Sequence, residues 1–138
     1  MKITAHIQNR KDEHQVTLTT NGNAQNITIA SKIGGFGSSV SGGELLCLAL
    51  ATCYCNDVYR EAAKRGIVVE QVEVEVESEF GKEGESARYI GYRAKVSAHA
   101  SVDTIRELMT ITNRMAEIQK TVRKGLSISL ENIEAISL

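Results

Sequence analysis

The 138-residue sequence is long enough for one domain with a sizeable core and too short for two ordinary ones. Its 16 basic and 17 acidic residues leave a formal net charge of −1, so no global field favours nucleic acid or an anionic membrane surface as a partner. Because the amino terminus lacks the apolar run of a signal peptide and the three cysteines do not suit a secreted disulfide framework, we expect reduced thiols and a cytoplasmic location.

The amino-terminal third of the sequence has the pattern of three β-strands. Apolar and polar residues alternate over residues 3–8 and 16–20, and the polar segment between them indicates a β-hairpin. A turn at residues 21–23, where Asn and Gly tolerate positive φ, leads into a third strand over residues 26–31. The glycine-rich residues 34–39 that follow are expected to form a hinge or a lid over the next helix.

A long central helix is predicted over residues 41–65. Ser41 is a suitable N-cap, Glu44 completes a capping box, and Gly66 provides a stop signal. Residues 45–55 are almost entirely apolar and therefore should be buried, whereas the charged end of the helix should lie in water. The apolar run is too short to span a bilayer, so no membrane association is expected.

The C-terminal half is predicted to contain a second hairpin, two helical segments and a last strand. Valines alternate with glutamates over residues 72–77, and a return strand over residues 88–100 can place its basic residues opposite those glutamates. Ser101 caps a helix whose apolar face continues, with or without a break, as far as Gly125. A last strand is predicted over residues 126–130.

Strands grouped as hairpins, with helices that do not alternate with single strands, indicate an α+β fold in a single domain of residues 1–138. Thr-Ala-His at residues 4–6, the glycine-rich loop, Glu-Leu-Leu at 44–46 and Ala-Leu-Ala-Thr-Cys at 49–53 together resemble the OsmC/Ohr family of small thiol-dependent hydroperoxide reductases. The resemblance implies an intertwined homodimer, in which curved antiparallel sheets from both chains wrap the two long central helices.

The resemblance also implies a reaction. In the peroxidase members of that family, a cysteine in the central helix attacks an organic hydroperoxide, and a second cysteine at the start of a later helix resolves the sulfenic acid. Cys53 matches the first cysteine, whereas Ala116 stands where the second would be. The resemblance therefore implies a peroxidase of oxidative-stress defence without cofactor or metal, acting on a small hydrophobic hydroperoxide with an external thiol as reductant. Glu44 and Arg10 are its candidate activating residues.

The residues themselves leave the role of Cys53 open. Burial among apolar side chains raises the pKa of a thiol, and Cys53 lies too far along its helix to benefit from the dipole of that helix. Ionisation would need a cation such as Arg10 or Arg60, whereas Asp57, one turn away, would oppose it.

Alternatives to a catalytic Cys53 follow from the same helix. Cys47 and Cys55 point away from Cys53 around the helix, so neither can form a disulfide with it without melting the helix. All three thiols can instead be small core hydrophobes, and a metal site is disfavoured because no histidine lies nearby in sequence. The other candidate functions are a non-enzymatic dimer that binds a small hydrophobic ligand at its interface and a plain structural dimer.

Overall fold

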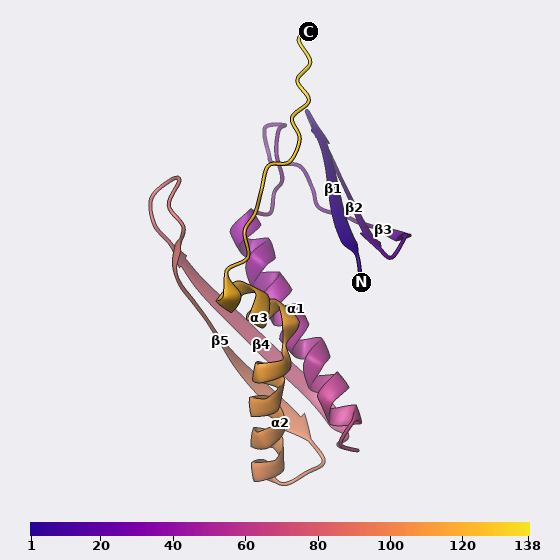
Figure 1. Cartoon of the computed structure of the whole chain (residues 1–138), viewed down its shortest axis with the longest axis vertical. Helices are drawn as coiled ribbons and strands as arrows, with labels where there is room; N and C mark the ends of the chain where they lie inside the picture. Colours follow the sequence, from indigo (N-terminus) through magenta and orange to yellow (C-terminus); the bar gives the residue numbers. More distant parts are fainter. The chain divides into compact units, whose positions relative to one another are not determined.

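The structure, a computed structural model, describes residues 1–138 and has the element order β-β-β-α-β-β-α-α (Figure 1). Its antiparallel strands and its helices form an α+β fold, as predicted from the sequence. The chain divides into two compact units, Met1–Leu46 and Cys47–Leu138, with the boundary inside the first helix, α1 (Gly42–Ala63). None of the helices has the length and hydrophobicity that a membrane crossing requires.

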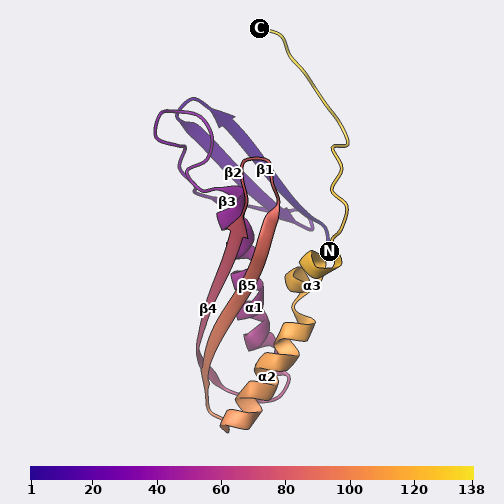
Figure 2. The ribbon, with the colours of Figure 1, turned by 90° about the vertical axis from the view of Figure 1, so that its left-hand side faces the viewer.

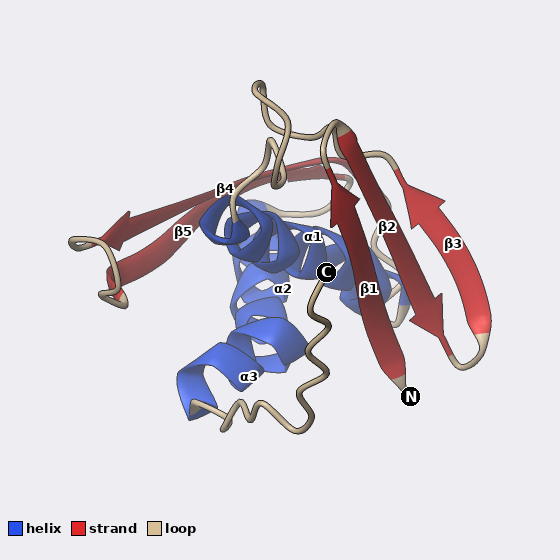
Figure 3. Ribbon diagram, turned by 90° about the horizontal axis from the view of Figure 1, so that it is seen from above, coloured by secondary structure: helices blue, strands red, loops and turns tan.

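The amino-terminal unit holds a three-stranded antiparallel sheet, drawn in red in Figure 3, with the strand order β1-β2-β3. The strands are β1 (Ile3–Arg10), β2 (Glu13–Thr20) and β3 (Asn23–Ile27). β3 starts earlier than predicted because Asn23 already pairs with Thr20 across the tight turn between them.

The glycine-rich loop is fastened to the β1–β2 turn. The backbone N–H of Asp12 donates to the carbonyl oxygen of Gly35 at 2.6 Å, and that of Gly37 donates to Oδ1 of Asn9 at 3.0 Å. Gly35 has φ +115°, a conformation that side chains rarely adopt. These hydrogen bonds tie the loop to the β1–β2 turn, and its role as a hinge or lid stays a prediction.

Helix α1 begins with the predicted capping box. Glu44 accepts a hydrogen bond from the backbone N–H of Ser41 at 2.6 Å, and its own N–H donates to the Ser41 hydroxyl at 3.1 Å. Burial along the helix follows the expectation only in part, because Leu50 and Tyr54 of the apolar run are buried but other residues are not as expected. Asp57 and Glu61, near the charged end, are buried, whereas Leu48 in the apolar half is 60% exposed. The carboxylates can be buried because neighbouring cations pair with them.

The core of the C-terminal unit lies between helices and a long hairpin. The hairpin consists of β4 (Val69–Phe80) and β5 (Ala87–Ala98), and both α1 and α2 (Val102–Met115) lie on one of its faces (Figure 3). Buried side chains of α1 and α2 meet the inward valines of β4; they are Tyr54, Val58, Ala62 and Leu108. On the outer face, Nε of Arg93 lies 2.8 Å from Oε2 of Glu75, which confirms the predicted cross-strand pairing.

A break separates α2 from α3 (Glu117–Lys124), and the two helices run in different directions (Figure 2). It falls at Ala116, whose φ of −59° and ψ of 115° are not helical. Nη2 of Arg123 donates to Oδ1 of Asn113 at 2.6 Å and holds the two helices together across the corner. α3 then ends at Gly125, in the left-handed conformation with φ 66°, as the sequence predicted.

The predicted last strand is absent. Residues 126–138 form no helix or strand (Figure 1), and their large apolar side chains, Leu126 and Ile128 among them, are exposed. A strand needs a neighbour to pair its backbone groups, and no strand of a single chain pairs with these residues.

Candidate functional site

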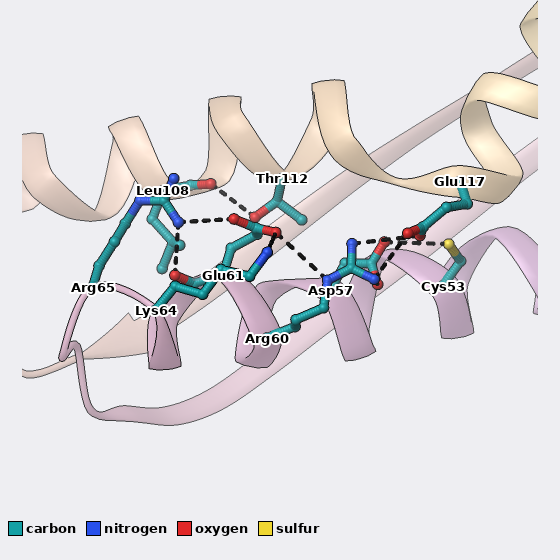
Figure 4. Close-up of polar contacts among 9 residues, drawn as sticks. All are labelled: Cys53, Asp57, Arg60, Glu61, Lys64, Arg65, Leu108, Thr112 and Glu117. Atoms are coloured by element: carbon teal, nitrogen blue, oxygen red, sulfur yellow. Dashed lines mark hydrogen bonds and ion pairs between the residues drawn. The ribbon is translucent and has the colours of Figure 1, made fainter.

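The candidate site is built around the thiol of Cys53, which is half-buried on α1. Its Sγ donates to Oδ2 of Asp57, with 3.5 Å between the two atoms. The contact follows from helix geometry, because residues four apart lie on the same face. Asp57 is only 5% exposed, so its carboxylate is largely shielded from water. Figure 4 shows this pair beside Glu117, which comes from the start of α3.

A guanidinium links the two carboxylates of the site. Nη1 of Arg60 lies 3.1 Å from Oδ1 of Asp57 and 2.9 Å from Oε1 of Glu117. In a third contact, Nε of Arg60 lies 3.5 Å from Oε1 of Glu61. Arg60 therefore pairs with three carboxylates. Its charge is not directed at the Cys53 sulfur, although the sequence had made Arg60 a candidate cation for that thiol.

The first turn of α3 is fixed against α1 close to Cys53. Gln119 is 3% exposed, and its Nε2 donates to the carbonyl oxygen of Leu50 at 2.9 Å. Ala116, at the N-cap of α3, is completely buried and offers no side chain to cap the helix. The N–H groups of a first helical turn carry partial positive charge, so α3 supplies the favourable helix dipole that α1 cannot give this thiol.

These surroundings act on the pKa values in opposite directions. Burial is the largest influence on Cys53 and raises the pKa of its thiol. The backbone N–H of Ile118 lowers that pKa, whereas the carboxylates of Asp57 and Glu117 raise it. The pKa of Asp57 is also raised, mainly by burial. The pKa of Glu117 is lowered, because its own backbone N–H and then Arg60 favour its charged form.

The resting thiol is therefore protonated, and its proton points at a carboxylate. Asp57 opposes ionisation of Cys53, as the sequence analysis expected. A reaction at Cys53 must then include removal of this proton.

The other two cysteines are separate from this site. All three cysteines are free thiols. The thiol of Cys47 lies 3.1 Å from the hydroxyl of Ser78 on β4. Cys55 is likewise half-buried in α1.

Arg10 and Glu44 lie in the amino-terminal unit, whereas Cys53 lies in the other. The hydrogen bonds to Ser41 lower the pKa of the Glu44 carboxyl. Arg10 is exposed at the end of β1, opposite Glu13, and no ion pair joins it to Glu44. The activating roles of both residues stay predictions.

The same cluster contains residue types that can bind a metal ion. Cys53, Asp57 and Glu117 offer one sulfur and two oxygen atoms that lie within 4.8 Å of one another. However, the guanidinium of Arg60 already supplies the positive charge that both carboxylates need. We therefore assign no metal to these residues.

The family model described as "OsmC-like protein" matches residues 35–131, which is more than half of the chain and includes the whole Cys53 cluster. The chain belongs to this family. The resemblance in the central helix predicted it correctly. A search of curated protein sequences gave no match.

Solved structures agree with the OsmC-like fold. An OsmC-like protein from Mycoplasma pneumoniae aligns with a TM-score of 0.62 and 16% identity, over 90% of this chain and 87% of that chain. An osmotic stress induced and detoxification response protein from Psychrobacter arcticus gives 0.64 and 14%, over 88% of both chains. An organic hydroperoxide resistance protein from Vibrio cholerae, with captopril bound in one of its active sites, gives 0.54 and 18%, over 91% and 86%. At these identities the likeness establishes the fold alone.

Sequence reasoning missed Glu117 as a member of the site. The sequence predicted helix here, with or without a break, and only the docking of α3 on α1 brings Glu117 to the Cys53 cluster. The sequence nevertheless contained a feature that could have placed Glu117 near Cys53. The resemblance aligned residues 116–119 with the segment that carries the second family cysteine, and such a segment must lie close to the first.

Proposed function

We propose that this OsmC-like protein is a thiol-dependent organic hydroperoxide reductase with Cys53 as its nucleophile. The observation that supports this most is the placement of the Cys53 thiol, which is half-buried between a carboxylate on α1 and the amino-terminal turn of α3. A nucleophilic thiol needs an acceptor for its proton and a group that stabilises developing negative charge. Asp57 and the first turn of α3 offer these two functions.

The reaction has two stages. The Cys53 sulfur attacks the outer oxygen of the hydroperoxide ROOH, so that an S–O bond forms as the O–O bond breaks. The thiol proton ends on the departing alkoxide, and the products are the sulfenic acid Cys53–SOH and the alcohol ROH. One external thiol then displaces water to give a mixed disulfide, and a second releases Cys53 with formation of the external disulfide.

The external reductant is part of the proposal because the chain has no second thiol near Cys53. Ala116 occupies the position at the start of α3 where the resemblance expects the resolving cysteine. Without added thiol, the sulfenic acid should persist after one turnover and then be oxidised further to sulfinic acid.

Glu44 and Arg10 remain the proposed activating residues from the amino-terminal unit, on the strength of the family resemblance. We also propose that the active protein is a homodimer. The exposed apolar side chains of a single chain support this, because a monomer would leave them in water; they include Leu48, Phe36, Leu126, Ile128 and Leu130.

Peroxide consumption with a small thiol as reductant tests the proposal. The wild-type protein should consume cumene hydroperoxide through many turnovers with excess dithiothreitol, and Cys53→Ser should reduce consumption to the uncatalysed rate. Cys55→Ser is the matched control and should retain most of the activity, because Cys55 lies outside the cluster. Equal rates for the wild type and Cys53→Ser would rule out the reductase.

A second candidate function is the binding of a small hydrophobic ligand without turnover. Two observations favour it: the captopril seen in an active site of the related Vibrio cholerae structure, and the raised pKa of Cys53. In that case a hydrophobic ligand should bind equally well to the wild type and to Cys53→Ser in calorimetry, and neither protein should consume peroxide.

A further inference from the structure

The proton of the Cys53 thiol has one carboxylate acceptor within hydrogen-bonding distance. That acceptor is Oδ2 of Asp57, 3.5 Å from the sulfur. The Asp57 residue is only 5% exposed. A carboxylate that is shielded from water is a stronger base than one in solution. Its second oxygen, Oδ1, is held by Arg60 at 3.1 Å, which leaves Oδ2 for the thiol.

The remaining charged groups around the thiol are already engaged. Arg60 pairs with Glu61 and with Glu117, and Glu117 is anchored at the start of α3. Tyr92 of β5 is not a base for this proton, because burial raises the pKa of its phenol and its hydroxyl donates to Asn113. None of these groups is free to take the proton.

We propose that Asp57 is a catalytic residue that accepts the Cys53 thiol proton as the sulfur attacks, with Arg60 and Glu117 as positioning residues that hold its carboxylate in place. The assignment rests on the proposed reductase function. As the S–O bond forms and the O–O bond breaks, the proton moves from Sγ to Oδ2 of Asp57. It then passes to the departing alkoxide, which leaves as the alcohol, and Asp57 returns to its charged form.

A carboxylate beside a thiol can either repel the negative charge of the thiolate or accept the thiol proton. If Asp57 only repels negative charge, its removal lowers the pKa of Cys53 and makes oxidation faster at every pH below that pKa. If Asp57 accepts the proton, its removal makes oxidation slower there, even though the thiol then ionises more easily. Asp57→Asn distinguishes these cases because it keeps the size and hydrogen-bonding oxygen of the side chain and removes its charge.

The test is the single-turnover rate of Cys53 oxidation by cumene hydroperoxide from pH 5 to 9, with the thiolate fraction followed by its ultraviolet absorbance. The wild-type rate should fall by much less than tenfold per pH unit below the thiol pKa, because the thiol–carboxylate pair reacts. The Asp57→Asn rate should follow the thiolate fraction, tenfold per pH unit, and should be at least about tenfold below the wild type at pH 6. A faster Asp57→Asn protein at pH 6 would overturn the proposal.

Two further variants test the role of Glu117 and define the background. Glu117→Gln should shift the acid limb of the wild-type profile to lower pH, because Glu117 raises the pKa of Asp57. An unmoved limb would contradict the role of Glu117. Glu75→Gln removes an exposed carboxylate on β4 and should leave the profile unchanged.

Alkylation by iodoacetamide, measured over the same pH range, keeps this proposal separate from the reductase function. Alkylation at sulfur also requires loss of the thiol proton but no peroxide. If peroxide fails to oxidise the wild type while Asp57→Asn still slows alkylation at pH 6, the reductase proposal fails and the proton-acceptor role holds. Faster alkylation of Asp57→Asn at pH 6 would reject that role. Circular dichroism should show native helix content in each variant.

Discussion

At the scale of single residues, the chain combines a family cysteine with surroundings of its own. Cys53 sits beside a buried carboxylate, and the guanidinium of Arg60 is neutralised by three acidic groups. A thiol in such surroundings ionises reluctantly, so its reactivity depends on where its proton goes. The approach of Asp57 could be predicted from its spacing in the helix. The presence of Glu117 could not, because it depends on how two helices dock.

Ala116→Cys tests whether the start of α3 faces Cys53 as the family resemblance implies. The new thiol would stand at the N-cap of α3, two residues before the backbone N–H that lowers the pKa of Cys53. We expect peroxide to generate a disulfide between residues 53 and 116 and to protect the protein from overoxidation in the absence of external thiol. Peptide mapping by mass spectrometry checks this. Sulfinic acid at Cys53 with no such disulfide would contradict it.

At the scale of elements, most helices and strands could be predicted because each carries its own signal. The capping box at Ser41, the alternating valines of β4 and the left-handed stop at Gly125 are local features that the structure reproduces. Burial along α1 could not be predicted in this way. It depends on which end of the helix meets the β4–β5 hairpin and on ion pairs that allow carboxylates to be buried.

Glu61 forms ion pairs with Lys64 and Arg65, and these pairs lead to a prediction about stability in acid. Hydrogen bonds from Lys64 and then from Arg65 lower the pKa of its carboxyl to about 2. The folded pKa lies below the unfolded value of about 4.3, so the stabilisation is fully present above that value and is lost as the pH falls towards 2. Glu61→Gln should therefore lower the Tm at pH 7, and the difference from the wild type should shrink towards pH 2.

Thermal melts at pH 7, 4 and 2.5 check this prediction. Glu75→Gln is the control, because an exposed pair with Arg93 contributes only about 0–1 kcal/mol. A Tm difference between the wild type and Glu61→Gln that is as large at pH 2.5 as at pH 7 would show that the carboxylate charge is not what stabilises the helix end.

At the scale of the whole molecule, the missing last strand and the exposed Leu48 of α1 both leave apolar side chains without a partner. Leu48 is 60% exposed, and residues 126–138 alternate apolar and polar side chains at their start without pairing to any strand. The sequence predicted a strand there because alternation favours one, but a strand exists only with a partner edge. A second copy of the chain is the partner that we propose.

We therefore expect sedimentation equilibrium to give a dimer at micromolar concentration. Removal of residues 126–138 should weaken the dimer, because it takes away the unpaired apolar segment. Leu48→Glu should weaken it as well, since a charge would replace an exposed apolar side chain at the proposed interface. The matched control is Tyr89→Glu, an exposed position on β5. A folded wild-type monomer at these concentrations would contradict the dimer.

The central claim is that Cys53 reacts with a hydroperoxide. It is tested most directly by mass spectrometry of the intact protein and of its peptides after one equivalent of cumene hydroperoxide in the presence of dimedone, which traps sulfenic acid. We predict a single dimedone adduct on the peptide that contains Cys53, with Cys47 and Cys55 unmodified. An unmodified Cys53, or an adduct on Cys47 or Cys55 instead, would contradict the account.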